Sequence, residues 1–231
     1  AKKLLHVSNL YHIQPQAELA RELCRHSFAD RVFFCNSGAE ANEAAIKLAR
    51  YYGHKKGIES PTIIVMEKAF HGRTMGALSL TASKPVHRDR YFPTVPGVEH
   101  IPYAYCYRCA FGLDYPACGL HCLEFAREVI KMQTTGSLAA ILVEPVQGTA
   151  GNVVPPDGFV RAVQAIAAVF EELTLSGRDE QLPEKDGIFA GLLVAEMMAI
   201  MGSSLTELRR QLLAVFRHEL ADFQFESETQ G

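Results

Sequence analysis

The feature that most constrains the fold is an alternation of short apolar runs with longer helical patterns. Three runs, RVFFC at residues 31–35, TIIVM at 62–66 and LAAILVEPV at 138–146, are too short for helices and rich in aliphatic or aromatic side chains. Each is followed along the chain by a segment whose apolar residues recur every three or four positions. Strands that alternate with helices predict an α/β fold with a mostly parallel sheet and flanking helices.

The segments with helical spacing define the predicted helices. Ser37 suits the N-cap of the helix that starts near Ala39, because its hydroxyl can accept a bond from a free amide of the first turn. Residues 91–122 are rich in Pro, Gly, Tyr and Cys and predict mainly loop structure. We expect helices within residues 15–27, 39–52, 71–82, 122–133, 158–173, 188–201 and 205–220.

A polar stretch, TLSGRDEQLPEKD at residues 174–186, is the best candidate for a linker. It divides the chain into a predicted α/β domain at residues 1–173 and a C-terminal helical segment at residues 187–231. The first domain includes a cysteine-rich loop at residues 103–122.

Composition excludes several classes of partner. A net charge of -3 leaves no basic surface for nucleic acid. No run of about 18 apolar residues is present, so we expect no membrane-spanning helix. Six cysteines without a secretory signal suggest a reducing compartment, and we expect a cytoplasmic protein.

The turn Ser37-Gly38-Ala39 lies where a predicted strand meets a predicted helix. The first N–H groups of a helix lack partners within the helix and lie at the positive end of its dipole. Gly38 allows close approach of a ligand, and the Ser37 hydroxyl adds a hydrogen-bonding group. The turn therefore suits a phosphate. An ordinary capped helix without a ligand is the alternative.

Longer motifs around this turn resemble the class III aminotransferases, which use pyridoxal phosphate and include acetylornithine, ornithine and 4-aminobutyrate aminotransferases. The resemblance covers residues 3–159 and implies a partial large domain of the pyridoxal-phosphate transferase fold. It is carried, in chain order, by HVSNLYHIQPQAELARELC, NSGAEANEAAIKLAR, KAFHGRTMGALSLTA, YFPTVPGVEHIPYAYCYRC and ILVEPVQGTAGNVVPPDGF.

The resemblance also implies roles for individual residues. Ser37, Gly38 and Ala39 would hold the cofactor phosphate, and Phe70 would stack on the pyridine ring with His71 beside it. On the substrate side, Arg73 would reach a carboxylate and Glu144 would lie at the end of a strand. Taken singly, each residue is better explained without a ligand, with Phe70 as a core residue, Arg73 as a solvated charge and Glu144 as a turn carboxylate. The ordered set of motifs favours the functional roles. The implied substrates are a small amino acid, of omega-amino or acetylornithine type, and a 2-oxo acid, and the implied assembly is a homo-oligomer.

Two groups that transamination needs are not recognisable in this sequence. The family uses a lysine downstream of the EPVQG strand, which forms a Schiff base with the cofactor, and an aspartate beside the pyridine nitrogen. After Phe159 the only lysine is Lys185, in the predicted linker. We therefore assign no catalytic residue and expect cofactor binding without full turnover.

Four cysteines form the pattern C-x2-C-x8-C-x3-C at Cys106, Cys109, Cys118 and Cys122. Four thiolates from one loop can bind zinc or hold an iron–sulfur cluster. The central spacing is shorter than in common zinc ribbons, so a loop without metal is the alternative. A second hypothesis for the whole chain follows, namely a non-catalytic metal-binding or assembly module organised by this loop.

The tail is similar to another family. Residues 182–212 resemble a helical segment of the phosphohexomutases (phosphoglucomutase and phosphomannomutase). The sugar-contacting, phosphoserine and metal-binding segments of that family are not found here, and an amphipathic helical hairpin is the simpler interpretation. A remnant of a sugar-phosphate mutase is the third hypothesis, and a fusion, a truncation and a design all remain open as origins.

Overall fold

The structure is a computed structural model that describes residues 11–27 and 29–176. The described residues divide into two compact units between Phe34 and Cys35. In the first unit, helix α1 (Gln14–Arg25) has Pro15 in its first turn, where the fixed φ of proline suits a helix start. The predicted helix within residues 15–27 is therefore confirmed.

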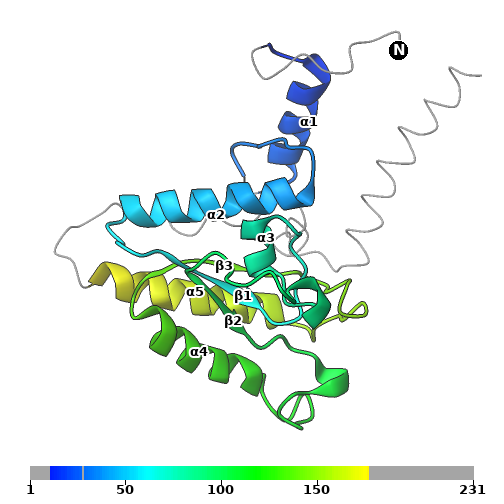
Figure 1. The fold of residues 1–231 in the computed structure, drawn as a ribbon, viewed down its shortest axis with the longest axis vertical. Coiled ribbons are helices and arrows are strands. Elements are labelled where there is room, and N and C mark those ends of the chain that lie inside the picture. Colours follow the sequence, from blue (N-terminus) through cyan, green and yellow to red (C-terminus); the bar gives the residue numbers. More distant parts are fainter. Residues whose placement is uncertain (1–10, 28, 177–231) are drawn as a thin grey trace, which may run out of the picture. The chain divides into compact units, whose positions relative to one another are not determined.

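The second unit is built on a parallel three-stranded sheet (Figure 1). Its order is β2 (Val98–Ile101), β1 (Thr62–Met66), β3 (Leu138–Leu142), and both neighbours run parallel to β1. All five residues of β1 are buried, as expected for a central strand that is covered on both faces. The predicted α/β fold with a parallel sheet is confirmed.

Helices cover both faces of this sheet. Helices α2 (Gly38–Lys55) and α3 (Met75–Leu80) pack on one face, and α4 (His121–Thr134) and α5 (Phe159–Ser176) lie on the other (Figure 1). Two short 3-10 turns, Pro85–His87 and Cys106–Arg108, lie in the connections. The result is a three-layer arrangement in which the ends of the strands remain accessible to loops.

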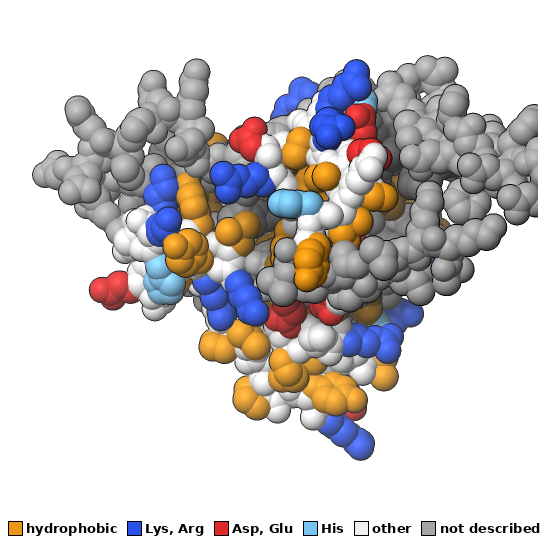
Figure 2. Space-filling model, turned by 90° about the horizontal axis from the view of Figure 1, so that it is seen from above, with side chains coloured by type: hydrophobic (Ala, Val, Ile, Leu, Met, Phe, Trp, Pro, Cys, Tyr) orange, Lys and Arg blue, Asp and Glu red, His pale blue; other side chains and the backbone are white. Residues whose placement is uncertain are grey.

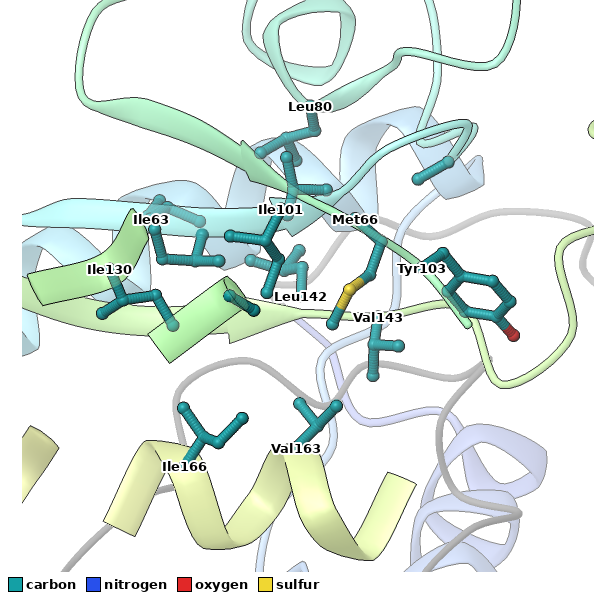
Figure 3. Close-up of a cluster of buried hydrophobic side chains, with 14 of the residues drawn as sticks. Ile63, Met66, Leu80, Ile101, Tyr103, Ile130, Leu142, Val143, Val163 and Ile166 are labelled. Carbon is teal, nitrogen blue, oxygen red and sulfur yellow. The ribbon is translucent and has the colours of Figure 1, made fainter. Parts of the chain in front are cut away.

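The core lies on both faces of the sheet, against α2 and α3 on one face and against α4 and α5 on the other. Figure 3 shows Ile63 and Leu142 of the sheet beside Ile130 of α4, and Val163 and Ile166 of α5 directed toward the strands. Each side chain of this size stabilises the fold by about 1.5–3 kcal/mol when it is fully buried. This packing fixes the strands whose ends carry the site.

Two of the predicted strands differ from the structure. Residues 31–35 form no strand, because no strand of the described sheet pairs with them, and Phe33 is 54% exposed. The run at residues 138–146 forms strand only as far as Leu142, and Pro145 lies beyond its end. The turn at Ser37 is therefore entered from irregular chain rather than from a strand.

The segment predicted as mainly loop contains β2. Its sequence, VEHI, has two adjacent polar residues between two apolar ones, and only Ile101 is buried, so it lacks the apolar run that marked β1. Helix α5 continues to Ser176, three residues into the predicted linker. The predicted helices at 188–201 and 205–220, the mutase-like segment at 182–212 and the tail at 187–231 lie outside the described residues.

Apolar side chains are also exposed on the surface. Figure 2 shows hydrophobic side chains lying among Lys and Arg side chains on one face. Val86, Tyr91, Phe92 and Tyr107 are all more than half exposed. Of the helices that the structure describes, none combines the length and the apolar character that crossing a membrane requires.

Candidate functional site

The predicted phosphate cradle lies at the first turn of α2. Ser37 is its N-cap with an extended backbone, and the Ser37 Oγ accepts the Glu40 N–H at 3.2 Å. The Glu40 carboxylate in turn accepts the Asn36 N–H at 2.8 Å, so the cap is reciprocal. Within the described ranges, the N–H groups of Gly38 and Ala39 have no hydrogen-bond partner. A Cβ on Gly38 would meet nothing within 4 Å, so the turn is open to a ligand.

The loop after β1 lies directly against this turn. Gly72 has φ +127°, and a Cβ there would lie 2.8 Å from the Cβ of Ala39 and 2.9 Å from that of Ala77. Only glycine allows this approach without a shift of the backbone. The Asn42 side chain donates to the carbonyls of Gly38 at 2.9 Å and His71 at 2.8 Å. The structure thus brings the loop of Phe70 and His71 to the turn of Gly38 and Ala39.

Phe70 and Arg73 lie together on this loop. The Phe70 ring is half-buried and meets His87 edge-on, with 5.5 Å between ring centroids. The exposed Arg73 places its guanidinium carbon 5.9 Å from the Phe70 ring centroid. An aromatic ring and an exposed cation next to an open helix N-terminus suit a flat anionic ligand.

Glu144 anchors the loop to the end of β3. Its carboxylate accepts the N–H of Phe70 and a backbone hydrogen bond from Gly148. Burial raises the pKa of Glu144, and these two hydrogen bonds partly offset that effect. As the structure has it, Glu144 orients the backbone of Phe70, and its predicted contact with substrate stays a prediction.

The ring of His71 has a buried environment. Its amide N–H donates to the Thr81 Oγ1 at 2.9 Å. Desolvation by burial, with the nearby His100 as a second cause, lowers the pKa of His71 to about 4, so the ring is neutral at pH 7. Its Nε2 has no hydrogen-bond partner within the described part of the chain. A place for His71 beside a cofactor ring stays a prediction.

Gln147 is a site residue that sequence reasoning missed. Its side chain is fully buried and donates through Nε2 to the carbonyl of Glu67 at 2.8 Å, which ties the end of β1 to the loop after β3. Its Oε1 finds no donor among the described residues. Nearby, the Tyr103 hydroxyl bonds to the carbonyls of Glu144 and Pro145, and burial followed by the Glu144 charge raises the pKa of Tyr103. Tyr103 and Gln147 lie within motifs that carry the resemblance, but their hydrogen bonds to distant carbonyls cannot be read from the sequence.

These residues fit pyridoxal phosphate. The two unpaired N–H groups and the open space at Gly38 suit a phosphate, and the helix dipole favours its negative charge. The half-buried ring of Phe70 suits a flat heterocycle. The Ser37 hydroxyl accepts from Glu40 and keeps its own proton to donate.

The four cysteines gather around a separate small cavity. Cys106, Cys109, Cys118 and Cys122 line a cavity of about 20 Å³ and are free thiols. Burial raises the pKa of Cys106 and Cys122, and the neighbouring thiols add to the rise. Throughout residues 11–27 and 29–176, no three His, Cys, Asp or Glu side chains are arranged to hold a metal ion. The predicted zinc or iron–sulfur site therefore gains no support from this geometry.

Similar proteins are aminotransferases. The chain is 46% identical over 158 residues to an acetylornithine aminotransferase of Gloeobacter violaceus, covering 68% of this chain and 34% of that protein. It is 39% identical over 180 residues to an acetylornithine aminotransferase of Methanocaldococcus jannaschii, covering 75% of this chain and 40% of that protein. Among solved structures, a thermostable (S)-enantioselective omega-transaminase from Thermomicrobium roseum matches with a TM-score of 0.65 and 35% identity, over 71% of this chain and 37% of that one.

The chain thus spans between a third and two fifths of the length of these relatives. The family described as "Aminotransferase class-III" matches residues 1–173 of the 231. The cradle of α2, the loop after β1 and the end of β3 all lie within that match. The chain belongs to the class-III aminotransferase family.

Proposed function

We propose that this chain forms the phosphate-holding and ring-stacking half of a pyridoxal-phosphate site in an aminotransferase. The observation that supports this most is the open turn at Gly38, where two unpaired N–H groups lie beside a loop that carries an aromatic ring. The proposed substrates are an amino acid of acetylornithine or omega-amino type and a 2-oxo acid. The similarity to acetylornithine aminotransferases supports this class.

Each residue of this chain has a proposed task. The amides of Gly38 and Ala39 bind the phosphate, and the Ser37 hydroxyl donates a further hydrogen bond. Phe70 covers one face of the ring and excludes water from it, and Glu144 keeps the Phe70 backbone in place. Arg73, which is exposed and lies over the Phe70 ring, orients a substrate carboxylate.

The bound cofactor would supply an electron sink for the bond changes at the amino carbon. This sequence contains no recognisable counterpart of the family's cofactor-binding lysine or of its aspartate. We therefore propose that this chain by itself binds the cofactor without full turnover. A homo-oligomer in the cytoplasm is the proposed setting, and the exposed Tyr91, Phe92 and Tyr107 agree with an interface.

A binding titration tests the proposal. The purified 231-residue chain is titrated with pyridoxamine 5′-phosphate, whose amine cannot condense with stray lysines, and the quenching of ligand fluorescence is followed. We expect saturable binding of one ligand per chain that inorganic phosphate competes away. Absence of binding at millimolar ligand would refute the phosphate assignment, and turnover of acetylornithine by the purified chain would refute the absence of a catalytic lysine.

A second candidate function rests on the cysteine cavity. The four free thiols lie around one small cavity, although no three side chains of the described residues are arranged to hold a metal ion. Metal analysis of protein purified without chelators tests this candidate. Less than about a tenth of an equivalent of zinc would count against it.

A further inference from the structure

The loop from Phe70 to Ala77 is held at two points by adjacent residues of α2. At the first, the Asn42 amide uses both of its hydrogens, one for the Gly38 carbonyl at 2.9 Å and one for the His71 carbonyl at 2.8 Å. One side chain therefore joins the cradle turn to the residue next to Phe70. These bonds set the spacing between the phosphate-binding amides and the aromatic ring.

Glu43 holds the loop at the second point, near the start of α3. Its Oε1 accepts the N–H groups of Gly76 at 2.9 Å and Ala77 at 3.1 Å, together with the Thr74 hydroxyl. Burial acts to raise the pKa of Glu43, but the hydrogen bonds from Thr74, Ala77 and Gly76 and the charge of Lys47 outweigh it and lower the pKa. Glu43 therefore stays charged at neutral pH and caps the start of α3.

The loop has further contacts that do not depend on Asn42. The His71 N–H is bound by Thr81, the Phe70 N–H by Glu144, and Gly72 packs on Ala39. Loss of the Asn42 amide would therefore shift the loop relative to the cradle without releasing it from the fold.

We propose that Asn42 is a positioning residue, which sets the distance between the phosphate cradle and Phe70 so that one ligand can reach both. Asn42 touches neither the phosphate nor the ring in this arrangement and acts through the carbonyls of Gly38 and His71. This inference rests on the proposed function, because it assumes a ligand that carries both a phosphate and a flat ring.

The test compares two ligands on the same variant. Asn42→Leu keeps the approximate size and helix preference of the side chain but removes both donors. Dissociation constants are measured for pyridoxamine 5′-phosphate, which uses cradle and ring, and for inorganic phosphate, which uses the cradle alone. Their ratio is independent of the fraction of folded protein, since unfolding weakens both apparent affinities equally.

We expect Asn42→Leu to lower the preference for pyridoxamine 5′-phosphate over inorganic phosphate by about tenfold, the size of one to two net hydrogen bonds. The control, Glu40→Gln, changes the same helix end through the cap contact with Asn36 and should leave the ratio within about twofold. An unchanged ratio in Asn42→Leu overturns the inference alone. A wild-type chain that binds neither ligand overturns the proposed function and the inference with it.

Discussion

The substitution Gly38→Asp separates ligand binding from folding at the cradle. A Cβ on Gly38 meets nothing within 4 Å, and its φ is not in the left-handed region, so the fold can accept a side chain there. Gly38 is the first residue of α2, where replacing glycine and adding a negative charge each stabilise a helix by about 0.3–1 kcal/mol. We expect the variant to unfold at an equal or higher urea concentration than the wild-type chain.

The same carboxylate should block the phosphate. A single negative charge about 5 Å from a dianionic phosphate costs about 1.7 kcal/mol even at the dielectric constant of water, and more in a partly buried turn. This corresponds to a loss of affinity for pyridoxamine 5′-phosphate of about 17-fold or more.

Two measurements on one preparation distinguish a loss of binding from a loss of folding. They are the urea midpoint and the dissociation constant for pyridoxamine 5′-phosphate from fluorescence titration. Gln133→Asp is the control, because it adds the same charge at an exposed position of α4, a helix on the other face of the sheet. Retained affinity in Gly38→Asp would refute the cradle. A parallel loss of stability and affinity would show that the open space at Gly38 has been misjudged.

Three other substitutions or conditions test the surrounding structure. The pKa values of His71 and His100 are about 4 in the folded chain and about 6.5 when it is unfolded, so the free energy of unfolding should be highest above pH 6.5 and fall toward pH 4, by up to about 1.4 kcal/mol per pH unit for each ring. Urea midpoints between pH 7.5 and 4.5 measure this loss of stability. A His100→Asn variant whose stability falls just as steeply with pH contradicts the prediction. Gly72→Ala should destabilise by about 1–3 kcal/mol through its positive φ and its approach to Ala39, and a chemical-denaturation curve that overlays the wild type contradicts the close packing. Ile64→Ala, in the fully buried β1, should cost about 2–5 kcal/mol in the same assay, and a loss below about 1 kcal/mol would mean that β1 is not central.

The parts of the structure that the sequence predicts well are those with strong local signals. β1 is a pure apolar run, α2 has a serine cap and a regular period, and both appear where expected. The order of motifs also singled out Gly38, Phe70 and Glu144, which the structure brings to neighbouring loops, and their roles in a site stay predictions. At these positions the local sequence pattern and the contacts between distant segments agree.

What escaped prediction depends on contacts between distant segments. RVFFC is as apolar as β1, yet it forms no strand, since strand formation requires a neighbouring partner as well as a suitable sequence. VEHI pairs with β1 in spite of its polar residues because it is an edge strand, of which only Ile101 is buried. The roles of Asn42 and Gln147 come from bonds across 29 and 80 positions of the chain, which no local pattern reveals.

The placement of β1 in the middle of a parallel sheet has a consequence for the order of events during synthesis. β1 leaves the ribosome before either neighbour, and its partner β3 is complete only at Leu142. Until then this strand, apolar except for Thr62, has one or both edges unpaired, which is a state that chaperones recognise and that favours aggregation. We expect nascent chains halted before residue 138 to be protease-sensitive throughout the loop after β1, and chains halted well beyond Gln147 to protect it. The turn at Ser37, with its own reciprocal cap, is synthesised before any of the three strands.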